Sequence, residues 1–325
     1  MTEKDSEDID YKGIVDAIKH NSIVFFLGAG ANLPVEEAPH WDSSHPTRPP
    51  SGDELAKYMA LDFIDRVPAL AKKDLQHVAT FYEIKRKSRA LYSLLHDIFD
   101  VDYPPRKIHT FLAELPSLLR SQGCTAEYPL IVTTNYDDIL ERALGDQPHA
   151  VYTYIEHGGD RGKFRLCNDG NVIEKPNELR LGKLGLKERF VIFKMHGTIT
   201  RSAESSDLEK DEYVITEDHY IDYLAGAPIA DVVPTGLVTA LKGRAILFLG
   251  YALQDWHLRV LLRRVLQGQP LSTSMWSVQL KADEVYRAYS QHQNITLIEQ
   301  PLDEFVDRLQ NELTGGTAAQ RGTSA

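Results

Sequence analysis

The chain has 325 residues, of which 42% are apolar and 26% are charged, so it contains enough material for one large α/β domain or two average ones. Its 36 basic and 47 acidic side chains give a formal net charge of −11, so we expect no direct nucleic-acid binding through the overall field of the protein. The acidic, polar start MTEKDSEDID is not a secretion signal, and no apolar run reaches about 18 residues, so we expect a cytoplasmic protein without a membrane span.

The predicted elements of the N-terminal half follow a disordered acidic tail at residues 1–10. A helix is expected in YKGIVDAIKH and a buried strand in SIVFFLG, and a long loop rich in Pro, Ser and His comes next. Residues 52–100 carry apolar side chains at helical spacing and are expected to be helical throughout. A further helix in KIHTFLAELPSLLR leads to the predicted strand PLIVTT.

In the C-terminal half, predicted strands and helices alternate. Strands are expected at AVYTYI, RFVIFKM, RAILFLG, MWSVQL and ITLIE, whose continuous apolar runs suit strands that are covered on both faces. We expect an irregular excursion at 157–187 and a disordered tail at 312–325. The alternation predicts an α/β fold with a Rossmann-like, mostly parallel sheet and helices on both faces. The chain would form a single domain at 11–310 with a helical insertion at 52–105.

Four of the predicted strands end in polar or glycine-rich segments, and open α/β sheets bind ligands beyond the carboxyl ends of their strands. The segments are FFLGAGAN, TTNYDD, FKMHGTI and ILFLGYALQD. In the first, Gly28 and Gly30 let the backbone turn sharply and approach a pyrophosphate. The nucleotide fingerprint G-x-G-x-x-G is incomplete, because Leu33 occupies the place of the third glycine. A plain strand-to-loop turn is therefore the alternative.

The other three segments also have structural alternatives. Asn135 could cap a helix whose first turn carries Asp137 and Asp138, or it could face a ligand together with Asp137. A lone histidine at a strand end, such as His196, is more often structural than catalytic, and the glycine turn at Gly250 could be plain architecture. Histidine nevertheless suits general-base chemistry, because its unperturbed pKa of about 6.5 lies near neutral pH.

Taken in order, the succession GAG, TxNxD, HG and FLGY resembles the sirtuin family, and more closely its zinc-less bacterial branch that occurs in anti-phage defence systems. The resemblance covers most of the chain and implies that NAD is the substrate. It also implies catalytic roles for Asn135 and His196. The residues that it implies in binding NAD are Gly28, Ala29, Gly30, Asn32, Thr134, Asp137, Gly250 and Tyr251.

The chain also departs from the pattern of the sirtuin protein deacylases. Its only cysteines, Cys124 and Cys167, cannot form the two CxxC pairs of the deacylase zinc module, and we expect no metal site. Ala252 stands where the family's Gly-Thr-Ser segment has its serine, and PPSG at 49–52 only loosely matches the family's proline-bearing cofactor loop. The implied reaction is therefore hydrolysis of NAD to nicotinamide and ADP-ribose, with water as the acceptor.

Two other classes of function are alternatives: an NAD-dependent protein deacylase or ADP-ribosyltransferase, and a non-catalytic sensor of NAD or ADP-ribose. A pure binder has little need of a base, so the joint presence of Asn135 and His196 favours an enzyme. The resemblance implies a homo-oligomer and a neighbouring defence protein such as a HerA-type ATPase. The helical region 52–100 could serve as a lid or an assembly surface, or it could simply cover one face of the sheet.

Overall fold

The structure is a computed structural model that describes residues 10–34, 40–201, 210–225, 233–251, 259, 262 and 273–315. Most of the two predicted tails, at 1–9 and 316–325, lies outside the described residues, as does Ala252. Helix α12, Leu302–Thr314, includes the first residues of the predicted tail at 312–325, so that boundary was placed too early.

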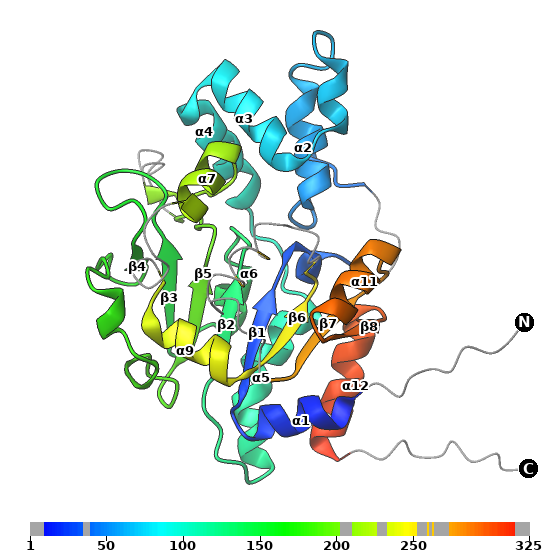
Figure 1. The fold of residues 1–325 in the computed structure, drawn as a ribbon, viewed down its shortest axis with the longest axis vertical. Coiled ribbons are helices and arrows are strands. Elements are labelled where there is room, and N and C mark those ends of the chain that lie inside the picture. Colours follow the sequence, from blue (N-terminus) through cyan, green and yellow to red (C-terminus); the bar gives the residue numbers. More distant parts are fainter. Residues whose placement is uncertain are drawn as a thin grey trace, which may run out of the picture.

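Within the described residues, eight strands form one sheet in the order β4-β3-β5-β2-β1-β6-β7-β8 (Figure 1). All neighbouring pairs are parallel except β3 with β4. The predicted Rossmann-like α/β sheet is therefore confirmed. The strands are β1 Ile23–Leu27, β2 Leu130–Thr133, β3 His149–Tyr154, β4 Phe164–Leu166, β5 Phe190–Lys194, β6 Ala245–Leu249, β7 Met275–Gln279 and β8 Ile295–Glu299.

The central strands are buried on both faces, which explains why their sequences are continuous apolar runs. Alternate side chains of β1 enter different cores: Val24 and Phe26 pack on one face, and Phe25 and Leu27 on the other. The first face is covered by α9, Thr235–Gly243, and α11, Glu284–His292. The second is covered by α1, Tyr11–Lys19, by α5, Lys107–Ser121, and by α12.

A third core belongs to the helices α2 Gly52–Leu61, α3 Leu75–Arg86 and α4 Ser88–Phe99, which we call the helical cap. In Figure 1 they lie together at the top of the view, beside α7, Glu217–Ala225. The expectation of helix throughout 52–100 was wrong in two places. The chain forms a short 3-10 segment that begins at Pro68, and it bends at Lys87, whose φ is +76°. Helix α2 ends at Leu61, before the proline, and the positive φ of Lys87 separates α3 from α4.

The segment 157–187 is not wholly irregular, because it contains β4, which pairs antiparallel with β3 and extends the sheet by one strand.

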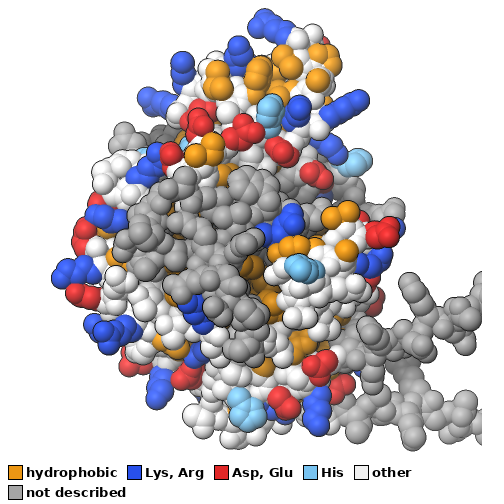
Figure 2. All heavy atoms as spheres, in the orientation of Figure 1, with side chains coloured by type: hydrophobic (Ala, Val, Ile, Leu, Met, Phe, Trp, Pro, Cys, Tyr) orange, Lys and Arg blue, Asp and Glu red, His pale blue; other side chains and the backbone are white. Residues whose placement is uncertain are grey.

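None of the helices in the described part of the chain is both long and apolar enough to cross a membrane. Figure 2 shows hydrophobic side chains together with lysines and arginines over the helices at the top of the view. The exposed large apolar residues of the cap are Leu61 and Ile84.

Candidate functional site

The described parts of the four segments singled out in the sequence lie side by side, because they follow the adjacent central strands β5, β2, β1 and β6. These strands are parallel, so their carboxyl ends meet at one edge of the sheet. The chain order also reverses at β1, which has β2 on one side and β6 on the other, and such switch points are the usual ligand sites of doubly wound sheets. A cavity of about 420 Å³ lies there.

The walls of this cavity come from the strand ends and from the helical cap. The sequence-predicted residues that line it are Ala29, Gly30, Asn32, Thr134, Asn135, Asp137, His196, Gly250 and Tyr251. Gly28, the remaining one, forms the turn behind them. The cap and the segment before it contribute Pro49, Pro50, Ser51, Gly52, Asp53, Leu55, Asp74, Leu75, Gln76 and Phe99.

The turn after β1 packs directly on the turn after β6. The Gly28 amide donates to the carbonyl of Leu249 at 3.1 Å, and the Gly30 amide donates to the carbonyl of Gly250 at 2.8 Å. A Cβ atom on Gly30 would lie 2.6 Å from the Gly250 carbonyl oxygen. The glycines are therefore required by the close approach of two backbones, which brings the backbone of both turns to the cavity.

Asn135 does not cap the helix that follows it. Helix α6, Ile139–Leu144, begins four residues later, with Asp138 at the N-cap position. The Asn135 side-chain amide instead donates to the carbonyl of Gly28 at 3.2 Å, so it links the turn after β2 to the turn after β1. Its backbone amide donates to Oγ1 of Thr133 at 3.1 Å. The capping alternative is thus excluded for Asn135, which lies in the cavity wall.

The two carboxylates after Asn135 face different surroundings. Asp137 is buried, accepts from Asn32 Nδ2 at 2.8 Å, and accepts from the Ile139 amide at 3.2 Å. Burial raises the pKa of Asp137, although the positive charge of Lys194 opposes this. Asp138 instead pairs with Arg201 at 2.6 Å and with Arg142 at 3.0 Å. Only Asp137 of the two lines the cavity.

Asn32 has one polar atom without a partner. Its side chain is 3% exposed, and its Oδ1 accepts no hydrogen bond from the described residues. Because Nδ2 is engaged by Asp137, Oδ1 is left as an acceptor at the wall of the cavity. Buried acceptors are rarely left unpaired in proteins, so this atom is suited to an N–H or O–H donor of a bound molecule.

His196 comes two residues after the end of β5 and is buried at the cavity. Its Nδ1 lies 3.3 Å from the hydroxyl of Tyr220 on α7, and the two rings meet edge to face with centroids 5.2 Å apart. The next residue, Gly197, has a φ of +93°, and a Cβ atom there would collide with the Glu212 carbonyl. The glycine lets the chain turn sharply after His196 and keeps the imidazole at the strand end.

The loop before α2 is held at the cavity by an ion pair. Arg48 and Glu54 are 2.7 Å apart, and Glu54 also accepts from the backbone amides of Ser51 and Trp41. These interactions, with Arg48 first among them, lower the pKa of the Glu54 carboxyl from 4.5 to about 2. The loosely matching PPSG segment at 49–52 is thereby fixed as one wall of the cavity.

This pair gives a prediction for stability against pH. A carboxyl whose pKa is lower in the folded state stabilises the protein above its ordinary pKa, and that contribution is lost as the pH falls toward the folded value. Glu54→Gln is therefore expected to lower the free energy of unfolding by about 2 kcal/mol at neutral pH. The difference from the wild type should shrink between pH 4.5 and about 2. Urea denaturation of both proteins across this range measures it, and a difference that did not change with pH would contradict the pairing.

Several residues at the cavity were not found from the sequence. Tyr220, Asp53, Asp74 and Gln76 all come from helices whose sequences indicate only amphipathic packing. The one available signal was the expectation that the region 52–100 could act as a lid. Tyr220 lies 24 positions after His196, and no local pattern connects the two.

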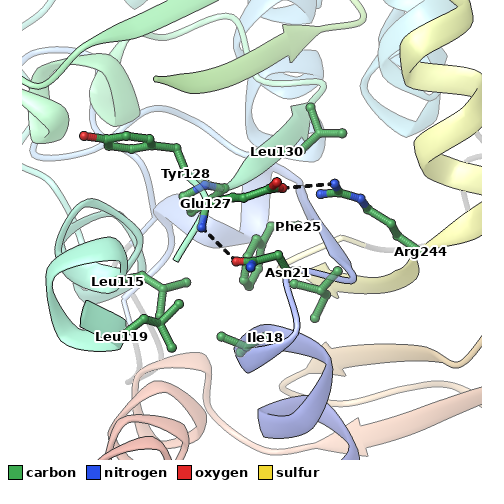
Figure 3. A pocket seen from close by; sticks show the side chains of 11 residues that line it. Ile18, Asn21, Phe25, Leu115, Leu119, Glu127, Tyr128, Leu130 and Arg244 are labelled. Atoms are coloured by element: carbon green, nitrogen blue, oxygen red, sulfur yellow. Dashed lines mark hydrogen bonds and ion pairs between the residues drawn. The ribbon is translucent and has the colours of Figure 1, made fainter. Parts of the chain in front are cut away.

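Two other cavities are lined by none of the predicted site residues. One of about 410 Å³ lies beside Asp138, Glu141 and Arg201. The other, of about 20 Å³, lies at the amino ends of the central strands, where Arg244 pairs with Glu127 at 3.3 Å (Figure 3). The second is about the size of a water site. Within the described residues, no three His, Cys, Asp or Glu side chains are grouped as a metal ion would need.

The chain is similar to a SIR2-like domain and to curated proteins of bacterial origin. The family model described as SIR2-like domain matches residues 129–298. "NAD(+) hydrolase ThsA" of Acinetobacter baumannii is 28% identical over 78% of this chain and 41% of its own length. "Defense-associated sirtuin 2" of Bacillus subtilis is 24% identical over 78% of this chain and 20% of its own length. "NAD(+) hydrolase ThsA" of Cytobacillus dafuensis is 26% identical over 60% of this chain. The chain spans less than half the length of these curated relatives.

Proposed function

We propose that this chain, which belongs to the SIR2-like domain family, is an NAD⁺ glycohydrolase that releases nicotinamide and ADP-ribose. The observation that carries the proposal is the meeting of Asn135, Asp137 and His196 with the glycine turns in one cavity at the switch point of the sheet. Two relatives are named as NAD⁺ hydrolases, which supports the same reaction.

The size and the lining of the cavity support NAD⁺ as its ligand. Its volume of about 420 Å³ is within the range of small-molecule sites. The turn at Ala29 and Gly30 would lie along the pyrophosphate, and Gly250 with Tyr251 beside the adenosine half. Asn135 would hold a hydroxyl of the nicotinamide ribose, because a side-chain amide offers both a donor and an acceptor. The open acceptor on Asn32 would receive a donor of the ligand.

The reaction needs little acid catalysis, because nicotinamide leaves from a cationic pyridinium as a neutral base. The bond between ribose C1′ and the ring nitrogen breaks, and both electrons go to the nitrogen. A water oxygen bonds to C1′, and its proton passes to His196 and then to solvent. The protein must hold the ribose and stabilise an oxocarbenium-like transition state. Asp137, which lines the same cavity as Asn135, would engage the carboxamide of the leaving nicotinamide.

The proposal extends to a biological setting. We infer that the chain acts in anti-phage defence, which is supported by the name of the Bacillus subtilis relative. An NAD⁺ hydrolase without control would drain its own cell, so its activity would depend on assembly of a homo-oligomer or on a neighbouring protein such as a HerA-type ATPase. The exposed Leu61 and Ile84 of the helical cap make that surface the candidate for such contacts.

The test is incubation of the purified protein with NAD⁺ and separation of the products by chromatography. We expect nicotinamide and ADP-ribose in equal amounts. Asn135→Ala is expected to lower the rate about 10²-fold or more, because the ribose is then poorly held. Transfer of ADP-ribose to a protein would favour the transferase alternative. Binding of NAD⁺ without any release, in the presence and absence of crowding agents that promote assembly, would contradict hydrolysis.

A further inference from the structure

A completely buried lysine lies beneath the candidate site. Lys194 is the last residue of β5 and precedes His196 by two positions, and its side chain is 0% exposed. Its Nζ donates to the carbonyl of Asp137 at 2.5 Å and to Oε1 of Glu141 at 2.9 Å. The carbonyl of Tyr136 lies 3.4 Å away. The three N–H donors of the ammonium thus meet three acceptors on the chain that follows β2.

The surroundings of this lysine favour its charged form in spite of its burial. Burial by itself lowers the pKa of Lys194, but Glu141 and Asp137 outweigh that effect and raise it above its usual value. A buried ion pair is a weak source of stability, because the desolvation of both charges offsets most of their attraction. An apolar pair of similar shape could therefore replace the ion pair, but it could not replace the bonds from the ammonium to the backbone carbonyls.

An apolar pair has no donor for a carbonyl, so it could not hold the backbone of the turn after β2. Lys194 is bonded to the carbonyl oxygens of residues 136 and 137, which lie between Asn135 and α6. The carbonyl of Tyr136 is also bonded from the other side by the amide of Ile199 at 3.1 Å. The turn after β2 is thus tied to β5 and its continuation. Asn135 and Asp137 come from the first of these segments and His196 from the second, so Lys194 joins the two segments beyond the end of the β2–β5 ladder.

We propose that Lys194, held by Glu141, is the positioning residue of the site, and that it fixes the turn carrying Asn135 and Asp137 relative to His196. It acts through the backbone and touches no substrate atom. The kinetic part of this inference rests on the proposed NAD⁺ cleavage, whereas the structural part concerns the turn alone. The effect on the reaction follows because a misplacement of about 1 Å can lower a catalytic rate about 10²-fold.

The experiment compares Lys194→Met with the double variant Lys194→Met/Glu141→Met. The single variant leaves the Glu141 carboxylate without its partner and is expected to lower Tm. The double variant removes both charges and is expected to recover only part of the Tm, because the carbonyl of Asp137 still lacks the donor that Lys194 provided. Its kcat for NAD⁺ cleavage should nevertheless stay about 10²-fold below that of the wild type, with KM changed less than about threefold. Lys107→Met, which breaks the exposed pair with Asp307, is the control and should change neither constant.

A second measurement does not depend on activity. Amide hydrogen exchange in the unliganded double variant is expected to be at least tenfold faster across residues 134–139 than in the wild type, and unchanged in β1 and β6. Unchanged exchange in the turn would overturn the proposal, and so would faster exchange with a wild-type kcat. If the wild type itself does not cleave NAD⁺, the proposed function fails, and the exchange measurement alone decides whether Lys194 holds the turn.

Discussion

His196→Ala is expected to lower kcat for NAD⁺ cleavage by about 10³-fold, because a positioned general base contributes about 10² to 10⁴ to a rate. The imidazole is buried at the cavity, and its Nδ1 lies beside the Tyr220 hydroxyl, which fixes the orientation of the ring. The substrate KM should change much less, since the contacts proposed for the pyrophosphate and the adenosine half lie on other strands. Steady-state kinetics with chromatographic detection of nicotinamide measures both constants.

The fold should survive this substitution. His196 follows the end of β5, and its ring meets Tyr220 and Tyr223 edge to face at the border of one apolar core. We therefore expect circular dichroism to be unchanged and Tm to fall by only a few degrees. His20→Ala, at the exposed end of α1, is the matched control and should keep wild-type activity. A His196→Ala variant with full activity would mean that the histidine only packs against Tyr220, as the structural alternative requires.

The positions of most strands, and the meeting of their carboxyl ends, were predictable because the signals for these strands are local. A run such as IVFFL indicates a buried strand by itself, and the rule that parallel strands present their carboxyl ends at one edge then places Gly28, Asn135, His196 and Gly250 together. The sequence pattern could not decide whether Asn135 caps a helix or lines the cavity. That depended on where α6 begins, and helix boundaries are set by contacts across the fold.

Other parts of the site had no local signal. The contact of Tyr220 with His196 exists because α7 packs over the strand end, and the bond of Lys194 to the carbonyl of Asp137 crosses 57 positions of sequence. A lysine inside FVIFK is even a sign against burial, since lysine is seldom buried without partners. The strand β4 was missed for a related reason. Three residues in a segment rich in Gly and Lys become a strand only because β3 offers an edge to pair with.

Gly250→Ala is expected to abolish NAD⁺ binding and to destabilise the protein by about 2–5 kcal/mol, the sum of a left-handed backbone and an overpacked contact. Gly250 has a φ of +63°, and a Cβ atom there would collide with the amide of Ala31 and the carbonyl carbon of Gly30. The collision involves backbone on both sides, so no side chain can move away. The turn after β1 would have to shift, and with it the surface that we propose for the pyrophosphate.

Gly315→Ala separates the two contributions. Gly315 has a similar φ of +70° at the end of α12, but no atom lies within 4 Å of the position of its Cβ. It should therefore cost only the backbone strain, about 1–2 kcal/mol, and leave NAD⁺ binding unchanged. Chemical denaturation and calorimetric titration with NAD⁺ on both variants give the comparison. If Gly250→Ala lost no more stability than Gly315→Ala and bound NAD⁺ normally, the close contact between the turns after β1 and β6 would not be what shapes the site. A larger loss at Gly250 with loss of binding would tie the affinity for NAD⁺ to that contact, because it is the feature that the two glycines do not share.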